Sequence, residues 1–327
     1  MRVLFAALAS AGHTYPLIPL ATALRDAGHE VHFAAGEHVH APLLRAGLRP
    51  FRPGDAFYEL YAEDLEPELA RLRPALVVHG WGVPEAAAAA RSAGVPALWH
   101  GFGRMFPGGI GLPVPTGGTH VDICPPSLQD QDFLATAERI ALRPVPYSDP
   151  GRIERASRPL VYLTLGTAFG TPELLTTAIR GLSGLGAQVV VATGRVSPDE
   201  LGAVPGNVTV RAWVNQAALW PHVDAVVHHG GSGTTLGALA FGVPQLVLPQ
   251  GADQFANAEA LCATGAALRL LPDDVSAEAV AEGARKLLAG PGSGGHRDAA
   301  RAIAAEIARM PSPEEVARAL PGWAERG

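Results

Sequence analysis

Short apolar runs alternate with stretches of helical spacing along the first part of the chain. Val3–Leu8 is an unbroken apolar run of strand length, and Leu17, Leu20 and Leu24 then recur on one face of a helix. The run EVHFAA, Glu30–Ala35, again has the length of a strand. The pattern predicts a strand-helix-strand unit with parallel strands.

The same alternation continues to the end of the chain. The first half adds strands over 75–80 and 95–101 with an alanine-rich helix, 84–94, between them. The second half adds strands over 159–165, 187–193, 207–213, 224–229, 244–249 and 266–270, with helices between them and two more at 276–289 and 296–308. This order predicts an α/β protein with doubly wound parallel sheets.

Two domains are expected, because 327 residues are more than one compact unit usually holds. The stretch from Arg143 to Arg158 lacks apolar periodicity and contains three prolines, which is typical of a linker. We predict an N-terminal domain at 1–143, a linker at 144–158, a C-terminal domain at 159–310 and a last helix, 311–327, that could pack back on the first domain. The Gly- and Pro-rich segment Pro107–Gly118 is expected to be a loop.

Composition narrows the class of function. Hydrophobic residues make up 48% and charged residues 17%, as in a well-buried globular protein. A net charge of -6 and a pI near 6.0 give no electrostatic footprint for nucleic acid or anionic lipid, although arginines greatly outnumber the single lysine, Lys286. No run reaches the ~18 apolar residues of a membrane span, and the first residues fit a buried strand better than a signal peptide. Cys124 and Cys262 have no metal-ligand spacing, so we expect buried thiols in a reducing cytoplasm.

A glycine-rich turn follows one fully apolar strand of the second half. The strand ends in His228-His229, and the helix after it begins with small residues from Gly231 to Thr234. The free N–H groups and the positive dipole end of such a helix bind anions, so a diphosphate would fit there with His229 as a hydrogen-bond donor. A plain strand-to-helix turn is the alternative for the turn taken alone.

Further polar and aromatic residues fall at the same predicted sheet edge. Asp253 and Gln254 follow the next strand, and a carboxylate beside an amide suits sugar hydroxyls. Trp213 follows an earlier strand and could stack on a base, with Val214 and Gln216 adding backbone and amide contacts. A single tryptophan is more often part of a core, but here all the candidates share one edge.

The segment from Trp213 to Gln254 resembles the nucleotide-sugar signature of family 1 glycosyltransferases, most of all the bacterial antibiotic and macrolide branch. The resemblance extends to GHTYPLIPLATAL near the start, ICPPSLQ at Ile123–Gln129, RPVPY in the expected linker and LVYLTLGT at Leu160–Thr167. It implies the GT-B fold, in which two Rossmann-like domains face each other across a cleft. It also implies a set of donor-binding residues: Gly12, Thr167, Trp213, Val214, Gln216, His229, Gly231, Ser232, Gly233, Thr234, Asp253 and Gln254.

The resemblance assigns a role to most of this set. Trp213 would stack on uracil or thymine, and the backbone of Val214 would hydrogen-bond to it. His229, Thr167 and the small residues of the turn would hold the diphosphate, whereas Asp253 and Gln254 would bind the transferred sugar. Plant members carry a ribose-binding glutamate where Gly237 stands here, so the ribose must be held differently.

His13 is the predicted catalytic base. It is expected in the loop after the first strand, and Gly12 beside it would let the backbone approach a ligand. An imidazole with the ordinary pKa of about 6.5 can take a proton from an acceptor hydroxyl near neutral pH. In plant members an aspartate at the end of the fourth strand orients this histidine. His79 stands at that position here, so the partner of His13 stays open, and His79 and Asp55 are the next candidates for the base.

The acceptor side carries fewer signals. We expect His79, Trp81, Phe102 and Met105 to contact the acceptor. Phe57–Arg73 and Pro107–Val121 look like short versions of insertions that shape this pocket in the family. A short pocket wall suggests an open pocket for a large or carrier-bound acceptor, or a protein that needs a partner for full activity.

These residues predict an inverting, metal-independent glycosyltransferase without a cofactor. The donor would be a TDP- or UDP-sugar carrying a deoxysugar or hexose, the acceptor a hydroxyl of a small-molecule natural product, and the protein a monomer or homodimer. DQD, Asp130–Asp132, matches the metal-binding Asp-x-Asp of another glycosyltransferase fold, but it lies between a Pro-rich segment and a helix rather than at a strand end.

Three other functions are weighed. A C-glycosyltransferase of aromatic polyketides could use the same base on a phenol. A non-catalytic sugar-nucleotide-binding protein that activates a partner transferase would keep the turn but would not need His13. An oxidoreductase is disfavoured, because no Gly-x-Gly-x-x-Gly follows the first strand.

Overall fold

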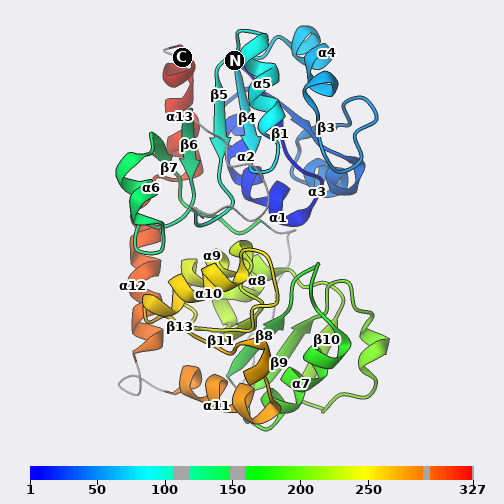
Figure 1. The fold of residues 1–327 in the computed structure, drawn as a ribbon, viewed down its shortest axis with the longest axis vertical. Coiled ribbons are helices and arrows are strands. Elements are labelled where there is room, and N and C mark those ends of the chain that lie inside the picture. The colour runs from blue at the N-terminus through cyan, green and yellow to red at the C-terminus, as the bar shows by residue number, and fades with distance from the viewer. Residues whose placement is uncertain (106–117, 148–158, 290–294, 326–327) are drawn as a thin grey trace. The chain divides into compact units, whose positions relative to one another are not determined.

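A computed structural model describes residues 1–105, 118–147, 159–289 and 295–325. The chain divides into two compact units (Figure 1). Unit 1 contains Met1–Asp149 and Arg309–Gly327, and unit 2 contains Pro150–Ala308. Most of the expected loop at Pro107–Gly118 and the later part of the expected linker lie outside the described residues.

Unit 1 is built on a seven-stranded sheet in the order β3-β2-β1-β4-β5-β6-β7. All neighbouring strands are parallel. The strands are β1 (Arg2–Ala6), β2 (Glu30–Ala34), β3 (Arg49–Phe51), β4 (Leu76–Gly80), β5 (Ala97–His100), β6 (Thr119–Asp122) and β7 (Arg139–Ala141). The order of the strands reverses between β1 and β4, because β2 and β3 follow on one side of β1 and β5 to β7 on the other side of β4. In open α/β sheets, ligands bind at the loops that follow the two strands at such a reversal.

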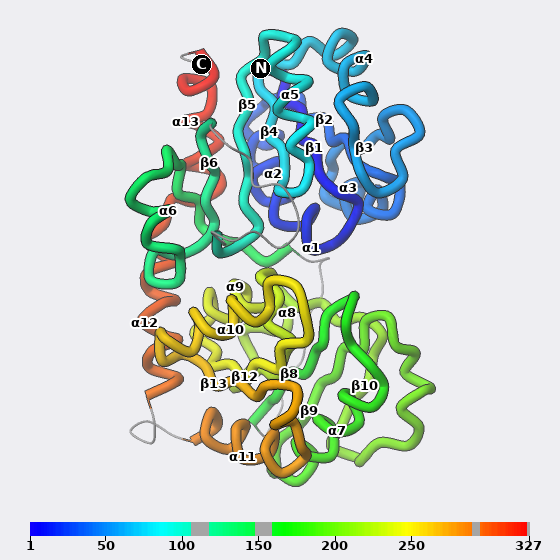
Figure 2. Tube along the Cα trace, viewed as in Figure 1, coloured from blue at the N-terminus to red at the C-terminus, as the bar shows by residue number. Residues whose placement is uncertain are grey.

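Helices cover the sheet of unit 1, because its central strands, β1 and β4, are apolar and buried on both faces. The helices are α1 (Ala11–Thr14), α2 (Ile18–Asp26), α3 (His40–Arg45), α4 (Ala62–Leu72), α5 (Pro84–Ser92), α6 (Gln131–Thr136) and α13 (Pro313–Ala324). Leucines and alanines of α4 and α5 share one buried cluster with β1 and β4. The last helix, α13, packs against α2, so both ends of the chain belong to unit 1 (Figure 2).

Unit 2 repeats the architecture with a six-stranded parallel sheet in the order β10-β9-β8-β11-β12-β13. Its strands are β8 (Leu160–Thr164), β9 (Gln188–Ala192), β10 (Val208–Arg211), β11 (Ala225–His228), β12 (Gln245–Val247) and β13 (Ala267–Arg269). Its helices are α7 (Pro172–Ser183), α8 (Gln216–Leu219), α9 (Ser232–Ala240), α10 (Gln254–Ala263), α11 (Ala277–Leu288) and α12 (His296–Arg309). The order reverses between β8 and β11, so the turn after β11 lies at the switch point.

The predicted fold class is confirmed, and the strands expected from apolar runs are present. Three short strands at the sheet's outer positions, β3, β6 and β7, carried no such signal. β6 has the sequence THVD and β7 the sequence RIA, and their polar residues hide the apolar alternation. Pairing with a neighbouring strand, rather than local propensity, makes these segments extended.

Candidate active-site residues of the two units

The glycine-rich turn of unit 2 presents free backbone donors. Gly230 has φ +93, a conformation that side-chain-bearing residues avoid, and it turns the chain from β11 into α9. Gly231 is the N-cap of α9 and provides no side-chain cap. The first N–H groups of α9 are therefore open to a ligand, which is the arrangement that binds anions at helix N-termini.

The two adjacent histidines have different surroundings. His228 is fully buried, and its Nδ1 accepts a hydrogen bond from the backbone N–H of Gly230 at 3.1 Å. Burial, with His229 nearby, lowers its pKa to about 3. His228 is thus a neutral structural residue that fixes the turn.

His229 lies between two glycines of the site. A Cβ added to Gly166, which follows β8, would be 2.5 Å from its Nε2, and one added to Gly231 would be 2.3 Å from it. Burial lowers the pKa of His229 to about 4, with the Thr164 backbone acting in the opposite direction. Its Nδ1 has no partner among the described residues. The imidazole of His229 is therefore neutral. Thr167, another predicted diphosphate ligand, lies exposed one position after Gly166.

A hydrogen-bond network joins the start of α10 to the turn. Oδ2 of Asp253 accepts from Nδ2 of Asn257 at 2.8 Å and from Oγ of Ser232 at 3.3 Å. Asn257 also donates to the carbonyl of Gly230 at 2.9 Å. Burial raises the pKa of the Asp253 carboxyl, although the bonds from Asn257 and Ser232 act in the opposite direction. Asn257 was not among the predicted residues, yet its i, i+4 spacing from Asp253 could have indicated the contact.

The other predicted donor residues take varied positions. Gln254 is buried, and its Oε1 accepts from the backbone N–H of Gln250 at 2.8 Å. Gly233 is exposed, whereas Ser232 and Thr234 are buried at the start of α9. The side chain of Gln216 donates to the hydroxyl of Tyr162 at 2.9 Å.

Trp213 is a surface residue. It is 57% exposed in the segment after β10, so core packing does not account for it. Val214 beside it is partly buried against the cluster that contains Trp220. A Cβ on Gly237 would lie 2.8 Å from Nε1 of Trp220, so the ring of Trp220 occupies the space that a glutamate side chain at this position would need.

In unit 1, His13 lies on a helical turn and not in the expected loop. It belongs to α1, whose N-cap is Ser10. Nδ1 of His13 is 2.8 Å from Oγ of Ser10. Burial lowers the pKa of His13 below its ordinary value. Ser10, at i, i+3 spacing on this turn, is thus the hydrogen-bond partner that the sequence left open.

The two alternative bases, His79 and Asp55, differ from His13 in exposure and in hydrogen bonding. His79 at the end of β4 is 2% exposed, and its Nδ1 lies 3.3 Å from the Gly80 carbonyl. Burial lowers its pKa to about 4. Asp55 is fully solvent-exposed, with Arg52 at 3.7 Å.

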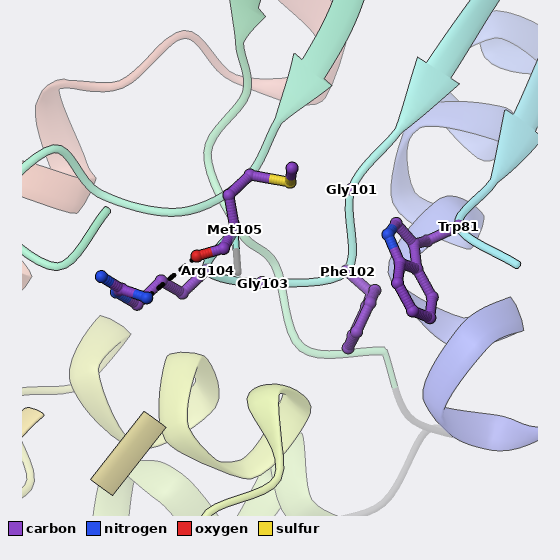
Figure 3. Close-up of a pocket in the computed structure, with 6 residues that line it drawn as sticks. All are labelled: Trp81, Gly101, Phe102, Gly103, Arg104 and Met105. Atoms are coloured by element: carbon purple, nitrogen blue, oxygen red, sulfur yellow. Dashed lines mark hydrogen bonds between the residues drawn. The ribbon is translucent and has the colours of Figure 1, made fainter. Parts of the chain in front are cut away.

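Aromatic rings surround one side of His13. Its ring lies 6.5 Å from that of Trp81 at an interplanar angle of 15°, and 5.5 Å from that of Phe102. Trp81, Phe102 and Met105 also line a pocket together with Gly101, Gly103 and Arg104 (Figure 3). Three of the four residues expected at the acceptor therefore share this pocket, whereas the buried side chain of His79 does not line it.

Metal ligation is not indicated in the part of the chain that the structure describes. No group of three or more His, Cys, Asp or Glu side chains there could hold a metal ion. Asp130 instead caps α6 by accepting from the Phe133 N–H at 3.0 Å, and it pairs with Arg104 at 3.3 Å.

Cys124 is buried as expected, but Cys262 is only partly buried. None of the described helices is long and apolar enough to span a bilayer.

Comparison with known proteins decides the family. The L-demethylnoviosyl transferase of Streptomyces niveus is 34% identical over 377 aligned positions that cover 98% of this chain and 97% of that protein. The chain belongs to the family 1 glycosyltransferases of antibiotic biosynthesis. Elloramycin glycosyltransferase ElmGT of Streptomyces olivaceus is 31% identical over 98% of the chain and 97% of its own length.

Two further comparisons extend to the domains of this glycosyltransferase. Residues 177–322 match the family described as erythromycin biosynthesis protein CIII-like, C-terminal domain. The crystal structure of glycosyltransferase VinC in complex with dTDP superposes with a TM-score of 0.86 and 26% identity, covering 100% of both chains. The fold is accordingly that of GT-B enzymes.

The chain is shorter than its relatives. The 377 positions aligned with the Streptomyces niveus enzyme exceed the 327 residues here, so at least 50 positions of that relative have no counterpart in this glycosyltransferase. These positions are internal to the alignment, which covers 98% of this chain and 97% of that protein.

Proposed function

We propose that this glycosyltransferase moves a sugar from a TDP- or UDP-sugar to a hydroxyl of a small-molecule natural product, with inversion and without a metal ion. The observation that carries the proposal is His13, a partly buried base held by Ser10 at the edge of an aromatic pocket. The crystallised VinC, which is similar over its whole length, holds dTDP, and this supports a thymidine nucleotide as the donor here.

The donor half of the reaction rests on the turn after β11. Negative charge grows on the diphosphate as its bond to the anomeric carbon breaks. The open N–H groups of α9 and the neutral imidazole of His229 would donate to those oxygens, and fixed donors of this kind stabilise such charge without reorganising. Trp213 would stack on the base, and Asp253 would accept hydrogen bonds from the sugar.

The acceptor half rests on His13. With its Nδ1–H donating to Ser10, the imidazole keeps Nε2 free for a proton. The acceptor oxygen then bonds to the anomeric carbon on the face opposite the diphosphate, the diphosphate leaves with the bonding electron pair, and the hydroxyl proton moves to Nε2. General-base assistance of this kind is typically worth about 10²–10⁴-fold.

The test combines donors, acceptors and a chelator. Purified protein is incubated with TDP-glucose or UDP-glucose and with 4-methylumbelliferone or a macrolide aglycone, in excess EDTA. We expect transfer to persist in EDTA and the new anomeric centre, read by NMR, to be inverted. Loss of turnover that manganese restores, or a retained centre, would contradict the mechanism. Turnover by the chain alone would also exclude the need for an activating partner.

C-glycosylation is a second candidate, favoured by the rings of Trp81 and Phe102 beside the base. An aromatic acceptor stacked there could attack through a ring carbon once His13 has removed its phenolic proton. The linkage distinguishes the two reactions, because a C-glycoside survives hot acid and an O-glycoside is hydrolysed.

A further inference from the structure

The pocket wall beside His13 is a segment without regular secondary structure. Five of the six pocket-lining residues are consecutive, from Gly101 to Met105, directly after β5 (Figure 3). The first is attached to the sheet, since the N–H of Gly101 donates to the carbonyl of Val121 at 3.0 Å. The last is attached to a side chain, since the N–H of Met105 donates to Oε1 of Gln129 at 2.8 Å.

Gln129 is placed to make this attachment rigid. It is 3% exposed, and its Oε1 also accepts from the N–H of Asp130 at 2.8 Å. Its Nε2 donates to Oδ1 of Asp122, at the end of β6, at 2.9 Å. Asp122 is fully buried and also accepts from the N–H of Cys124 at 3.0 Å. Both ends of the amide are therefore satisfied, and this buried side chain connects Met105, at the far end of the wall, to the end of β6.

The sequence between Asp122 and Gln129 explains how the two residues meet. Pro125 and Pro126 begin a turn in which the N–H groups of Leu128 and Gln129 both donate to the carbonyl of Pro125. This turn folds Gln129 back over Asp122. The motif ICPPSLQ had no role in the donor and base assignments. In the structure, its turn places Gln129 between Met105 of the pocket wall and Asp122 of β6.

We propose that Gln129 is a positioning residue that holds the acceptor-pocket wall, so that it sets the affinity for the acceptor without taking part in donor binding. The inference rests on the proposed function, because it takes this pocket as the acceptor site. Phe102, which lies between the two attachment points of the wall, is also the ring next to His13, so a displaced wall would alter the surface that an acceptor meets.

Gln129→Met keeps the length of the side chain and removes its polar atoms. Losing the hydrogen bond that fixes Met105, together with the bond from the same amide to Asp122, should raise the acceptor KM about tenfold. The donor KM should stay within about twofold. Gln131→Met is the matched control, since Gln131 is the exposed first residue of α6 and its side chain donates to the backbone carbonyls of Pro126 and Gln129 but not to the pocket wall. Its acceptor KM should be unchanged. An equal rise of both KM values in Gln129→Met would mean general loss of structure and would overturn the proposal.

Gln129→Glu adds a second measurement, the pH dependence of the acceptor KM, which should not change if Gln129 only stabilises the fold. A protonated glutamic acid can reproduce the pattern, with its carbonyl oxygen accepting from Met105 and its O–H donating to Asp122. An ionised one cannot, and it would face the Asp122 carboxylate. Burial raises the pKa of Asp122, although Arg139, 3.4 Å from its Oδ2, acts in the opposite direction. Two buried carboxyls beside this one arginine should share a proton, so we expect a raised carboxyl pKa for the pair.

The sign of the pH dependence follows from that pair. At pH 5.5 the ratio of the acceptor KM of Gln129→Glu to the native value should be near one, and at pH 8.5 roughly ten. Gln131→Glu should show no such change. With TDP-glucose and 4-methylumbelliferone as substrates, a ratio that is flat across this range would overturn the inference.

Hydrogen exchange separates this inference from the proposed function. The peptide containing residues 101–105 should exchange about tenfold faster in Gln129→Met than in the native protein or Gln131→Met. Absence of any sugar transfer would refute the proposed function while this measurement still tests the attachment. Unchanged exchange in an active enzyme would refute the role of Gln129 alone.

Discussion

The glycine-rich turn of unit 2, from Gly230 to Thr234, and the pocket of unit 1 are built from different parts of the chain. The glycine-rich turn consists mainly of backbone, with free N–H groups and closely packed glycines, and its one confined side chain is the imidazole of His229 between Gly166 and Gly231. The pocket of unit 1 consists of side chains from separate segments, with Ser10 behind His13 and Gln129 behind Met105. Substitutions that add a side chain to a glycine should therefore impair the turn of unit 2 most. Substitutions that remove a side chain should impair the pocket of unit 1 most.

The largest expected effect is the loss of the base in unit 1. His13→Ala should lower kcat by about two to four orders of magnitude, because, of the two alternative bases, His79 is buried and Asp55 is fully exposed. Quenching of Trp213 fluorescence by TDP should give a nearly unchanged donor affinity. Retained turnover would show that the base lies elsewhere.

The native kcat–pH profile sharpens the same prediction. Only neutral His13 can accept the proton, so kcat should fall with acid as the imidazole is protonated. Because burial lowers the pKa of His13, that fall should occur below pH 6.5, and the active range should extend to more acid pH than for an unperturbed histidine. A limb above 6.5 would contradict the burial of this ring.

An added methyl group in unit 2 is expected to have the next largest effect. Gly231→Ala is a steric test, since Gly231 has φ −66 and tolerates a side chain, yet its Cβ would lie 2.3 Å from Nε2 of His229. Displacing a donor to a charged oxygen costs about 1.5–3 kcal/mol, so the Kd for TDP should rise about ten- to hundredfold. Gly184→Ala, where φ is −84 and no atom lies within 4 Å, is the control and should bind TDP normally. If both variants bind alike, the confinement of His229 is not functional.

The smallest effect is expected from the partner of the base. Ser10→Ala removes one neutral hydrogen bond from Nδ1 of His13, so kcat should fall about two- to tenfold with the Kd for TDP unchanged. Ser10→Thr retains a hydroxyl and should recover most of the rate. A fall as large as that of His13→Ala would mean that Ser10 does more than orient the ring.

The order of strands and helices in both sheets could be predicted from the apolar runs, except at the outer strands. Those short strands are held by pairing with a neighbour, as β6 is with β5, and their own residues carry little pattern. The glycine-rich turn between β11 and α9 could also be predicted, because its residues are contiguous. Asn257 and Ser10 were overlooked although each stands one helical turn from a predicted residue, Asp253 and His13 respectively.

The sequence by itself determined the two doubly wound sheets and the glycine turn, because apolar periodicity and positive-φ glycines are local properties of the chain. Only the tertiary structure decided which groups surround each site residue. The low pKa values of His228 and His229 come from burial by distant segments, and Gln129 meets Met105 across 24 residues. Such contacts depend on which strands are neighbours in the sheets, and the spacing of residues along the chain does not predict that.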